Sequence, residues 1–146
     1  MLIQETKIQE HKLKEVMRNF KMHCEIIGQD AVGSAGGVAI LWNPEEVQFE
    51  YWISIPQILS GRFRIIGSQE WILLSNVYGR HIQSDRMNFL QNLAIIQSML
   101  PASPWTVGGD FNMITSINEK RGGLKIIDAD MEAFGDMIVE QRLVDI

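Results

Sequence analysis

Trp105-Thr106-Val107-Gly108-Gly109-Asp110-Phe111-Asn112 is the stretch that decides how this chain of 146 residues is interpreted. A short apolar run reaches Val107 and ends in two glycines, after which a carboxylate and a carboxamide follow. Side chains alternate along an extended chain, so Asp110 and Asn112 are predicted to point to one side and Phe111 to the other. The glycines permit a sharp turn and the close approach of a bulky group. The stretch therefore predicts either a strand end facing a metal ion or phosphate, or a turn whose Asp and Asn bond backbone amides.

The composition is typical of a globular protein, with 46% hydrophobic and 21% charged residues. The net charge of -5 argues against binding of nucleic acid through a broad basic surface. An enzyme acting on phosphodiesters remains possible, because a metal ion can supply positive charge locally. The single cysteine, Cys24, excludes an intramolecular disulfide and a site built from several cysteines. Without an apolar run of about 18–20 residues or a secretion signal, an intracellular location is expected, and the nucleus if the substrate is DNA.

Hydrophobic periodicity predicts strands and helices within one domain, residues 1–146. The clearest pattern is the alternation of apolar and polar residues from Val47 to Ile55, which indicates a strand with one buried face. The predicted strands cover residues 2–3, 24–27, 38–42, 47–55, 62–66, 71–78, 105–107 and 143–146. Helices are expected over about 13–20, from about Ser84, and over about 129–141, with Ser84 capping the second and Asp128 or Asp130 the third. Consecutive strands with inserted helices favour α+β layers.

Polar groups suited to phosphoester chemistry stand at three of these strand ends. Glu5 follows the first apolar run, Tyr78 ends another with His81 three residues later, and Asp110 and Asn112 end a third. A hard cation prefers carboxylate oxygens, and a second carboxylate can take a proton from an attacking water. An amide and a phenol can donate hydrogen bonds to charge that builds on phosphate oxygens. Taken one at a time, each residue is better explained as an ordinary surface, loop or strand-end residue.

Five motifs in order carry a resemblance to a known family. They are Gln4-Glu5-Thr6-Lys7, Gly36-Gly37-Val38-Ala39-Ile40-Leu41-Trp42, Asn76-Val77-Tyr78-Gly79-Arg80-His81, the opening stretch, and Lys120-Arg121-Gly122-Gly123. Together they resemble the endonuclease/exonuclease/phosphatase superfamily, whose members have the DNase I-like fold. The closest resemblance is to the apurinic-type endonuclease domain that plant non-LTR (LINE-type) retroelements carry before their reverse transcriptase.

The resemblance implies a fold and a reaction. The implied fold is α+β, an incomplete DNase I-like four-layer α/β sandwich of two packed, mostly antiparallel sheets flanked by helices. The implied reaction is hydrolysis of a phosphodiester with Mg²⁺ (or Mn²⁺), with DNA as the substrate, no membrane, and a reverse transcriptase fused in the parent element.

The resemblance also assigns roles residue by residue. Glu5 matches the metal-binding glutamate and Tyr78 the tyrosine that contacts the scissile phosphate. Asp110 matches the aspartate that orients or deprotonates the attacking water, and Asn112 the asparagine that hydrogen-bonds the phosphate. His81 stands where many members have asparagine, so it too is expected to contact the phosphate.

Several departures from the family pattern change the expectation for activity. The family's first strand with its asparagine, and its later strands with a further aspartate and an Asp-His pair, have no counterpart here, and Arg80 replaces the usual proline. We therefore expect a truncated, weakly active or inactive copy. Two alternatives are a degenerate domain that binds nucleic acid or protein without chemistry, and a phosphatase of the same fold acting on a phosphorylated small molecule or lipid headgroup. The net charge of -5 weighs against strong nucleic-acid binding without a metal.

Overall fold

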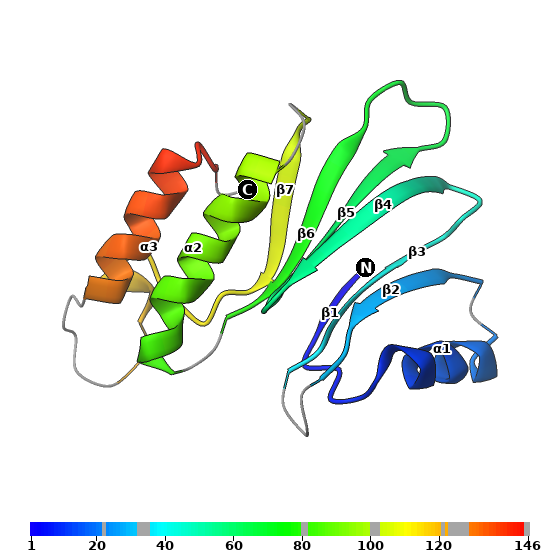
Figure 1. Ribbon diagram of the computed structural model, residues 1–146, viewed down its shortest axis with the longest axis horizontal. Helices are drawn as coiled ribbons and strands as arrows, with labels where there is room; N and C mark the ends of the chain where they lie inside the picture. The colour runs from blue at the N-terminus through cyan, green and yellow to red at the C-terminus, as the bar shows by residue number, and fades with distance from the viewer. Residues whose placement is uncertain are drawn as a thin grey trace. The chain divides into compact units, whose positions relative to one another are not determined.

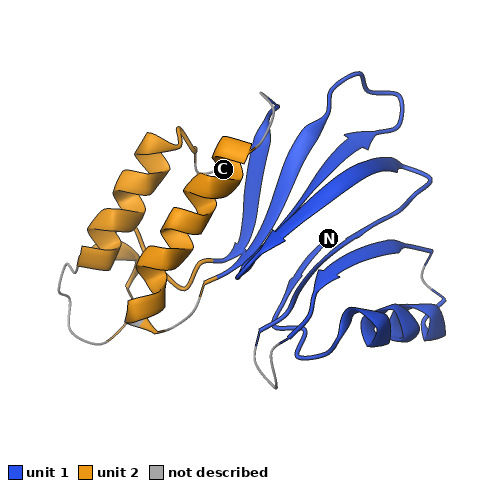
Figure 2. Ribbon diagram, in the orientation of Figure 1, with its two compact units in different colours: residues 1–78, 101–110 blue, residues 79–100, 111–146 orange. Residues whose placement is uncertain are grey.

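A computed structural model of the chain describes residues 1–21, 23–31, 36–79, 82–99, 103–120, 122 and 129–144. The chain divides into two compact units (Figure 2). Unit 1 comprises Met1–Tyr78 and Pro101–Asp110, and unit 2 comprises Gly79–Leu100 and Phe111–Ile146. None of the helices within the described ranges is long and apolar enough to cross a membrane.

Unit 1 contains two β-sheets and one helix (Figure 1). The first sheet has the order β1-β3-β2 and is antiparallel, with β1 (Leu2–Gln4), β2 (Glu25–Gln29) and β3 (Val38–Trp42). The second has the order β4-β5-β6-β7, with β4 (Val47–Ile55), β5 (Ile58–Ile65), β6 (Ile72–Tyr78) and β7 (Trp105–Asp110). Its strands are antiparallel except β7, which runs parallel to β6.

Apolar side chains on β3 hold the layers of unit 1 together. Val38 and Ile40 pack with Leu59 and Phe63 of β5 in the core shared by the two sheets. On the opposite face of the first sheet, Ala39 and Leu41 pack with residues of β2 and α1 (Glu10–Asn19). A strand buried on both faces must be apolar throughout, which explains the continuous run in the sequence. The result is a helix, a sheet and a second sheet in successive layers (Figure 1).

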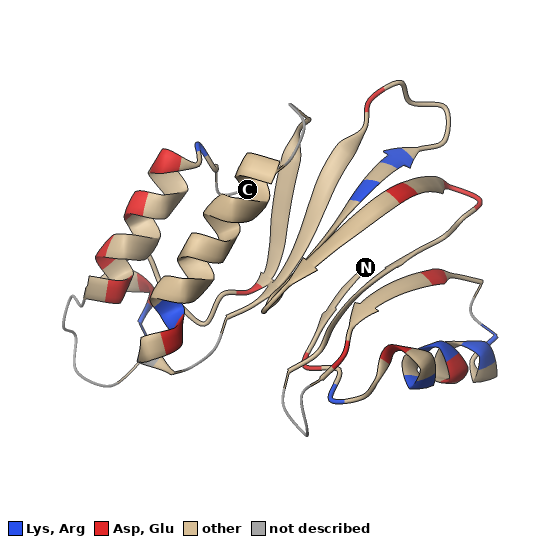
Figure 3. Cartoon of the chain, viewed as in Figure 1, with Lys and Arg blue, Asp and Glu red and all other residues tan. Residues whose placement is uncertain are grey.

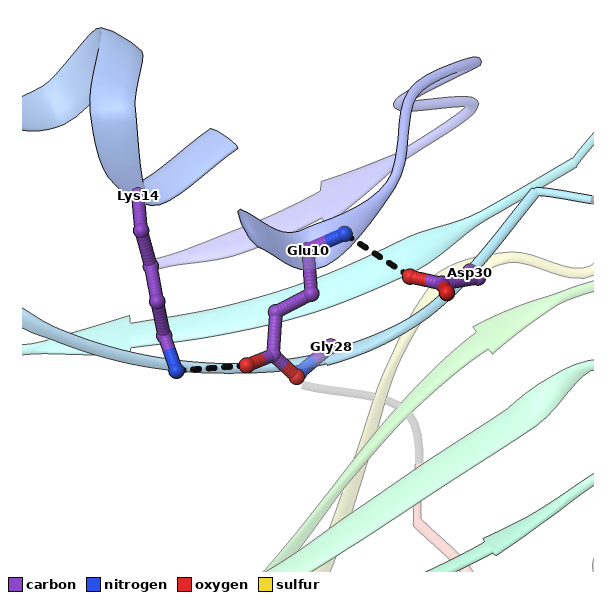
Figure 4. A network of polar contacts seen from close by, with 4 residues as sticks. All are labelled: Glu10, Lys14, Gly28 and Asp30. Carbon is purple, nitrogen blue, oxygen red and sulfur yellow. Dashed lines mark hydrogen bonds and ion pairs between the residues drawn. The ribbon is translucent and has the colours of Figure 1, made fainter. Parts of the chain in front are cut away.

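Hydrogen bonds of charged side chains connect helix α1 to the end of β2 (Figure 4). The Glu10 backbone N–H donates to the Asp30 carboxylate at 2.7 Å, so an acid from a distant segment satisfies the helix N-terminus. The Glu10 carboxylate accepts from the Gly28 backbone N–H at 2.9 Å and lies 2.5 Å from the Lys14 ammonium. The Glu10 carboxylate therefore accepts a backbone hydrogen bond from the outer strand of the sheet, and this bond fixes the position of α1.

Unit 2 contains α2 (Gln83–Met99), the 3₁₀-helix η1 (Ile117–Glu119) and α3 (Ala129–Glu140). The Phe111 ring lies between two others, with its centroid 6.2 Å from that of Phe89 and 5.2 Å from that of Phe134. An ion pair at 2.9 Å joins Arg86 of α2 to Asp130 of α3. Phe111 and this ion pair thus join the two helices and the segment after β7.

Most predicted elements are confirmed, and β4 has the predicted bounds. The strand predicted over residues 62–66 begins earlier, as β5 at Ile58, and so includes Ser60 and Gly61: the Ser60 hydroxyl is 2.6 Å from that of Ser75, and Gly61 leaves room for the Phe63 ring. Ser84 lies inside the first turn of α2 and so is not its cap. Asp130 lies inside α3 and pairs with Arg86, whereas Asp128 is outside the described residues. Leu143 and Val144 are not in a strand, and residues 145–146 are outside the described ranges.

Replacement of Glu10 by alanine is expected to lower the free energy of unfolding by about 1–2 kcal/mol, because the Gly28 N–H loses its acceptor. Urea unfolding followed by circular dichroism measures this loss. Glu15→Ala is the matched control, since Glu15 lies in the same helix and is exposed, so the change in helix propensity is the same. Equal unfolding free energies for the two variants would contradict the prediction.

Candidate functional site

Three predicted site residues of unit 1 come together at one end of its two sheets. Glu5 follows β1 directly, Tyr78 is the last residue of β6, and Asp110 is the last residue of β7. Tyr78 and Asp110 are partners in the parallel register of β6 and β7. The Tyr78 hydroxyl donates a hydrogen bond to Glu5 Oε1, a contact between residues 73 positions apart in the sequence. Two carboxylates and a phenol thus meet where three strands end.

The loop that carries Glu5 is held in an unusual backbone conformation. Glu5 and Lys7 have φ angles of +50° and +55°, in the left-handed region that residues other than glycine rarely adopt. Backbone hydrogen bonds from Thr6 N to Gly37 O (3.2 Å) and from Lys7 N to Gly36 O (3.1 Å) fix this loop. Such strain persists only where the surrounding structure imposes it, and it concentrates at functional sites.

The negative charge at this end of the sheets acts on Tyr78. The hydrogen bond to Glu5 raises the pKa of Tyr78 from 10.0 to about 12, with further contributions from burial and from the charges of Glu5 and Asp110. Loss of the phenolic proton would place a third negative charge beside the two carboxylates. At neutral pH the Tyr78 hydroxyl is therefore a hydrogen-bond donor.

Lys7, which is not among the predicted site residues, supplies a positive charge. Its ammonium lies 3.3 Å from Glu5 Oε2, and the two side chains are 59% and 44% exposed. Water and salt screen an ion pair of this kind, so it contributes little to stability. The Glu5 carboxylate therefore remains accessible to a divalent cation, whose attraction to it would exceed that of the Lys7 ammonium.

The two glycines of the opening stretch allow β7 to lie close to its neighbours. Gly109 has a φ of +136°, and a Cβ atom there would lie 2.1 Å from the Val77 carbonyl oxygen. A Cβ on Gly108 would lie 2.8 Å from Leu2 Cδ1 of β1. These positions need glycine because strands β6 and β1 occupy the space of a side chain. The close packing brings the end of β7, with Asp110, beside Tyr78.

The other two predicted site residues, Asn112 and His81, belong to unit 2. Strand β7 ends at Asp110, and Asn112 has a φ of +51°, so the predicted alternation of an extended chain through Asn112 is wrong. In unit 2 the Asn112 side-chain amide donates to the Gly79 carbonyl oxygen at 2.6 Å, and so joins two segments 33 residues apart in the sequence. His81 lies outside the described residues.

The donor atoms at the site suit a hard divalent cation. Glu5 and Asp110 offer carboxylate oxygens, and both carboxylates are close enough for their charges to raise the Tyr78 pKa. Within the described ranges no three His, Cys, Asp or Glu side chains gather as a metal-binding cluster. Mg²⁺ does not need one, because it is commonly held by one or two carboxylates together with waters and substrate phosphates. The residues therefore fit Mg²⁺ or Mn²⁺ bound jointly with a phosphorylated ligand.

Solved structures share this fold at low sequence identity. A crystal structure of TDP2 from D. rerio complexed with single strand DNA product is 16% identical, with a TM-score of 0.57, over 92% of this chain and 50% of that one. The mannosyl-6-phosphatase of Bacteroides thetaiotaomicron VPI-5482 is 17% identical, with a TM-score of 0.59, over 86% and 52%. An endonuclease/exonuclease/phosphatase family protein from Bacteroides thetaiotaomicron is 19% identical, with a TM-score of 0.56, over 70% and 46%.

These likenesses show the fold. No protein family model matches the sequence, and no curated protein matches it either. The chain spans about half the length of the solved structures named above. Its two packed sheets with helices form an α+β arrangement that matches part of the DNase I-like fold, as predicted.

Replacement of Gly109 by alanine is expected to lower the free energy of unfolding by about 2–4 kcal/mol, because the new Cβ meets the Val77 carbonyl at a strained φ. Gly135→Ala is the control: Gly135 lies in α3 with nothing within 4 Å of the added Cβ, so a gain of about 0.5–1 kcal/mol is expected. Chemical denaturation measures both values. A Gly109→Ala variant as stable as the unaltered chain would contradict the close packing.

The Tyr78 hydroxyl is expected to lose its proton near pH 12, and at a clearly lower pH once Glu5 is replaced by alanine, because the largest cause of the raised pKa is then absent. The chain has two tyrosines, so the ultraviolet absorbance of tyrosinate is followed in a Tyr51→Phe background. The folded state favours the neutral phenol, so the stability that Tyr78 contributes is present below pH 10 and is lost as pH rises to about 12. Glu46→Ala, which removes an exposed acid, should leave the midpoint unchanged. A midpoint insensitive to Glu5→Ala would rule out the contact.

Proposed function

We propose that residues 1–146 belong to one metal-dependent phosphodiester hydrolase domain of the DNA endonuclease type. The observation that supports this most is the convergence of Glu5, Tyr78 and Asp110 at the ends of three strands. The order of the sequence motifs supports a relationship to endonucleases of plant LINE-type retroelements, in which a reverse transcriptase would be fused to the domain. The solved structure of TDP2 with single strand DNA product supports DNA as the ligand class.

Each residue has a proposed role that its chemistry permits. Glu5 would hold Mg²⁺, which when bound neutralises charge on the phosphate and favours attack at phosphorus. Asp110 would accept the proton of the attacking water, and the leaving oxygen would take its proton from solvent. Tyr78, protonated because its pKa is about 12, would donate a hydrogen bond to a non-bridging phosphate oxygen. His81 and Asn112 are proposed as phosphate contacts on the strength of the sequence motifs.

The charge distribution explains why a metal is part of the proposal. Strands β6 and β7, which bring Tyr78 and Asp110, contain no Lys or Arg. Lys and Arg side chains occur on α1, whereas α3 carries acids and no Lys or Arg (Figure 3). Lys7 offsets only one of the two carboxylates at the site, so a polyanion would be repelled unless a further cation bound there first. A divalent ion at Glu5 would reverse the local charge.

A second candidate is a phosphatase that acts on a phosphorylated small molecule. The likeness to a mannosyl-6-phosphatase favours it, and the site chemistry would be the same. What differs is the group beyond the phosphate, which the fold does not specify.

Nicking of supercoiled plasmid in the presence of Mg²⁺ tests the proposal. The chain is expected to nick DNA weakly, with Mg²⁺ and not with EDTA, and Asp110→Ala and Glu5→Ala are each expected to lower this weak activity at least ~100-fold. Glu46→Ala is the matched control, because it removes an exposed acid of unit 1 away from the site. Release of phosphate from mannose 6-phosphate is measured in parallel.

The outcomes separate the candidates. Metal-dependent nicking that requires Asp110 supports the endonuclease. Phosphate release without nicking supports the phosphatase. Absence of both activities in a folded chain would leave the non-catalytic domain and overturn both enzyme proposals.

A further inference from the structure

Asn76 is a fully buried polar residue whose side chain joins the two sheets of unit 1. It lies on β6 with 0% of its surface exposed. Its amide nitrogen donates to the Ile3 carbonyl oxygen of β1 at 2.9 Å and to the Ala39 carbonyl oxygen of β3 at 2.8 Å. Its side-chain oxygen accepts from the Gln4 amide at 2.5 Å. Both amide hydrogens and the oxygen of Asn76 therefore bond to the opposite sheet.

These bonds lie next to the candidate site. Gln4 is the residue before Glu5, and Asn76 is two residues before Tyr78 on the same face of β6. Strand β1 has three residues and lies at the edge of its sheet, so few ladder hydrogen bonds fix it. The bonds to Ile3 and Gln4 thus set where β1 ends relative to β6, and where Glu5 stands relative to the Tyr78 hydroxyl.

We propose that Asn76 and Gln4 are positioning residues that hold Glu5 against Tyr78 and so shape the cation site. This proposal rests on the proposed function, from which it takes the roles of Glu5 and Tyr78. A buried amide without partners is costly, so the sheets are held in the one register that satisfies Asn76. Glu5, at a φ of +50°, does not keep its position through its own backbone preference. The backbone bonds of Thr6 and Lys7 hold its loop to Gly37 and Gly36, and the bonds of Gln4 and Asn76 position that loop relative to β6. Partners that orient metal ligands commonly change metal affinity 10–100-fold when they are removed.

A matched pair of glutamines separates positioning from stability. Gln29 of β2 also joins the sheets, since its amide donates to Ser54 Oγ at 2.7 Å and to the Ile55 carbonyl oxygen at 2.8 Å of β4. Gln29 and Gln4 stand on the two outer strands of the same sheet, with β3 between them. Gln4→Met and Gln29→Met each remove one inter-sheet amide and keep the side-chain length, but only Gln4→Met removes the support of Glu5.

The test measures the contact directly, apart from any activity. Nuclear Overhauser effects between the Tyr78 ring and the Glu5 side chain report their distance, and line broadening by Mn²⁺ reports cation affinity at the site. Gln4→Met is expected to weaken the Glu5–Tyr78 effect and to lower Mn²⁺ affinity about 10-fold or more. Gln29→Met is expected to lose stability but to keep the Glu5–Tyr78 Overhauser effect and the Mn²⁺ affinity.

The results decide between the two roles. Unchanged Overhauser effects in Gln4→Met, or equal changes in both variants, would overturn the positioning role. If Gln4→Met does not fold, Gln4→Leu, which also lacks the amide donor and adds no charge beside Glu5, takes its place under the same criteria. If the unaltered chain neither binds Mn²⁺ nor nicks DNA, the proposed function is wrong. The positioning role is tested separately, by comparing the Overhauser effects of the two variants.

Discussion

A buried amide, that of Asn76, is the interaction on which the arrangement of unit 1 depends. The two sheets share an apolar core, but apolar contacts are not directional and allow the layers to slide. An unsatisfied buried amide costs about 1–3 kcal/mol, so its bonds to β1 and β3 favour one relative position of the sheets. The apolar core supplies the stabilisation, and this carboxamide selects the geometry. The short strand β1, which leads directly to Glu5, depends on it most.

Close packing around the glycines has a similar consequence for the site. Gly109 lies against the backbone of Val77, and Gly37 lies so close to Thr6 that a Cβ would be 2.2 Å from its hydroxyl oxygen. Both glycines thus belong to contacts that bring a carboxylate, Asp110 or Glu5, to the end of β6. The energetic cost of the left-handed conformation at Glu5 is met by packing and hydrogen bonds elsewhere, which is common where geometry serves function.

The chemistry of the site follows from its charge. Glu5 and Asp110 keep Tyr78 protonated to about pH 12, so one donor and two acceptors face the same space. Such a group repels a free phosphate and attracts a divalent cation that a phosphate can then join. The same fold occurs in a structure with single strand DNA product and in a mannosyl-6-phosphatase, so the fold by itself does not specify a substrate.

Local patterns in the sequence specify the helices and strands and the chemical character of the site. The alternation of apolar and polar residues predicted the bounds of β4, and a continuous apolar run predicted β3. Carboxylates placed directly after apolar runs identified Glu5 and Asp110 as candidate site residues. These patterns are visible in the sequence because they reflect the burial of neighbouring residues. Tertiary packing explains why Ser60 and Gly61 continue a strand, since they contact Ser75, Phe63 and Ile27 on other segments or farther along β5. It also decided the partners of Asn76 and the contact of Tyr78 with Glu5, which depend on how strands distant in sequence pack. Periodicity records which face of a segment is buried, but not which segment covers it.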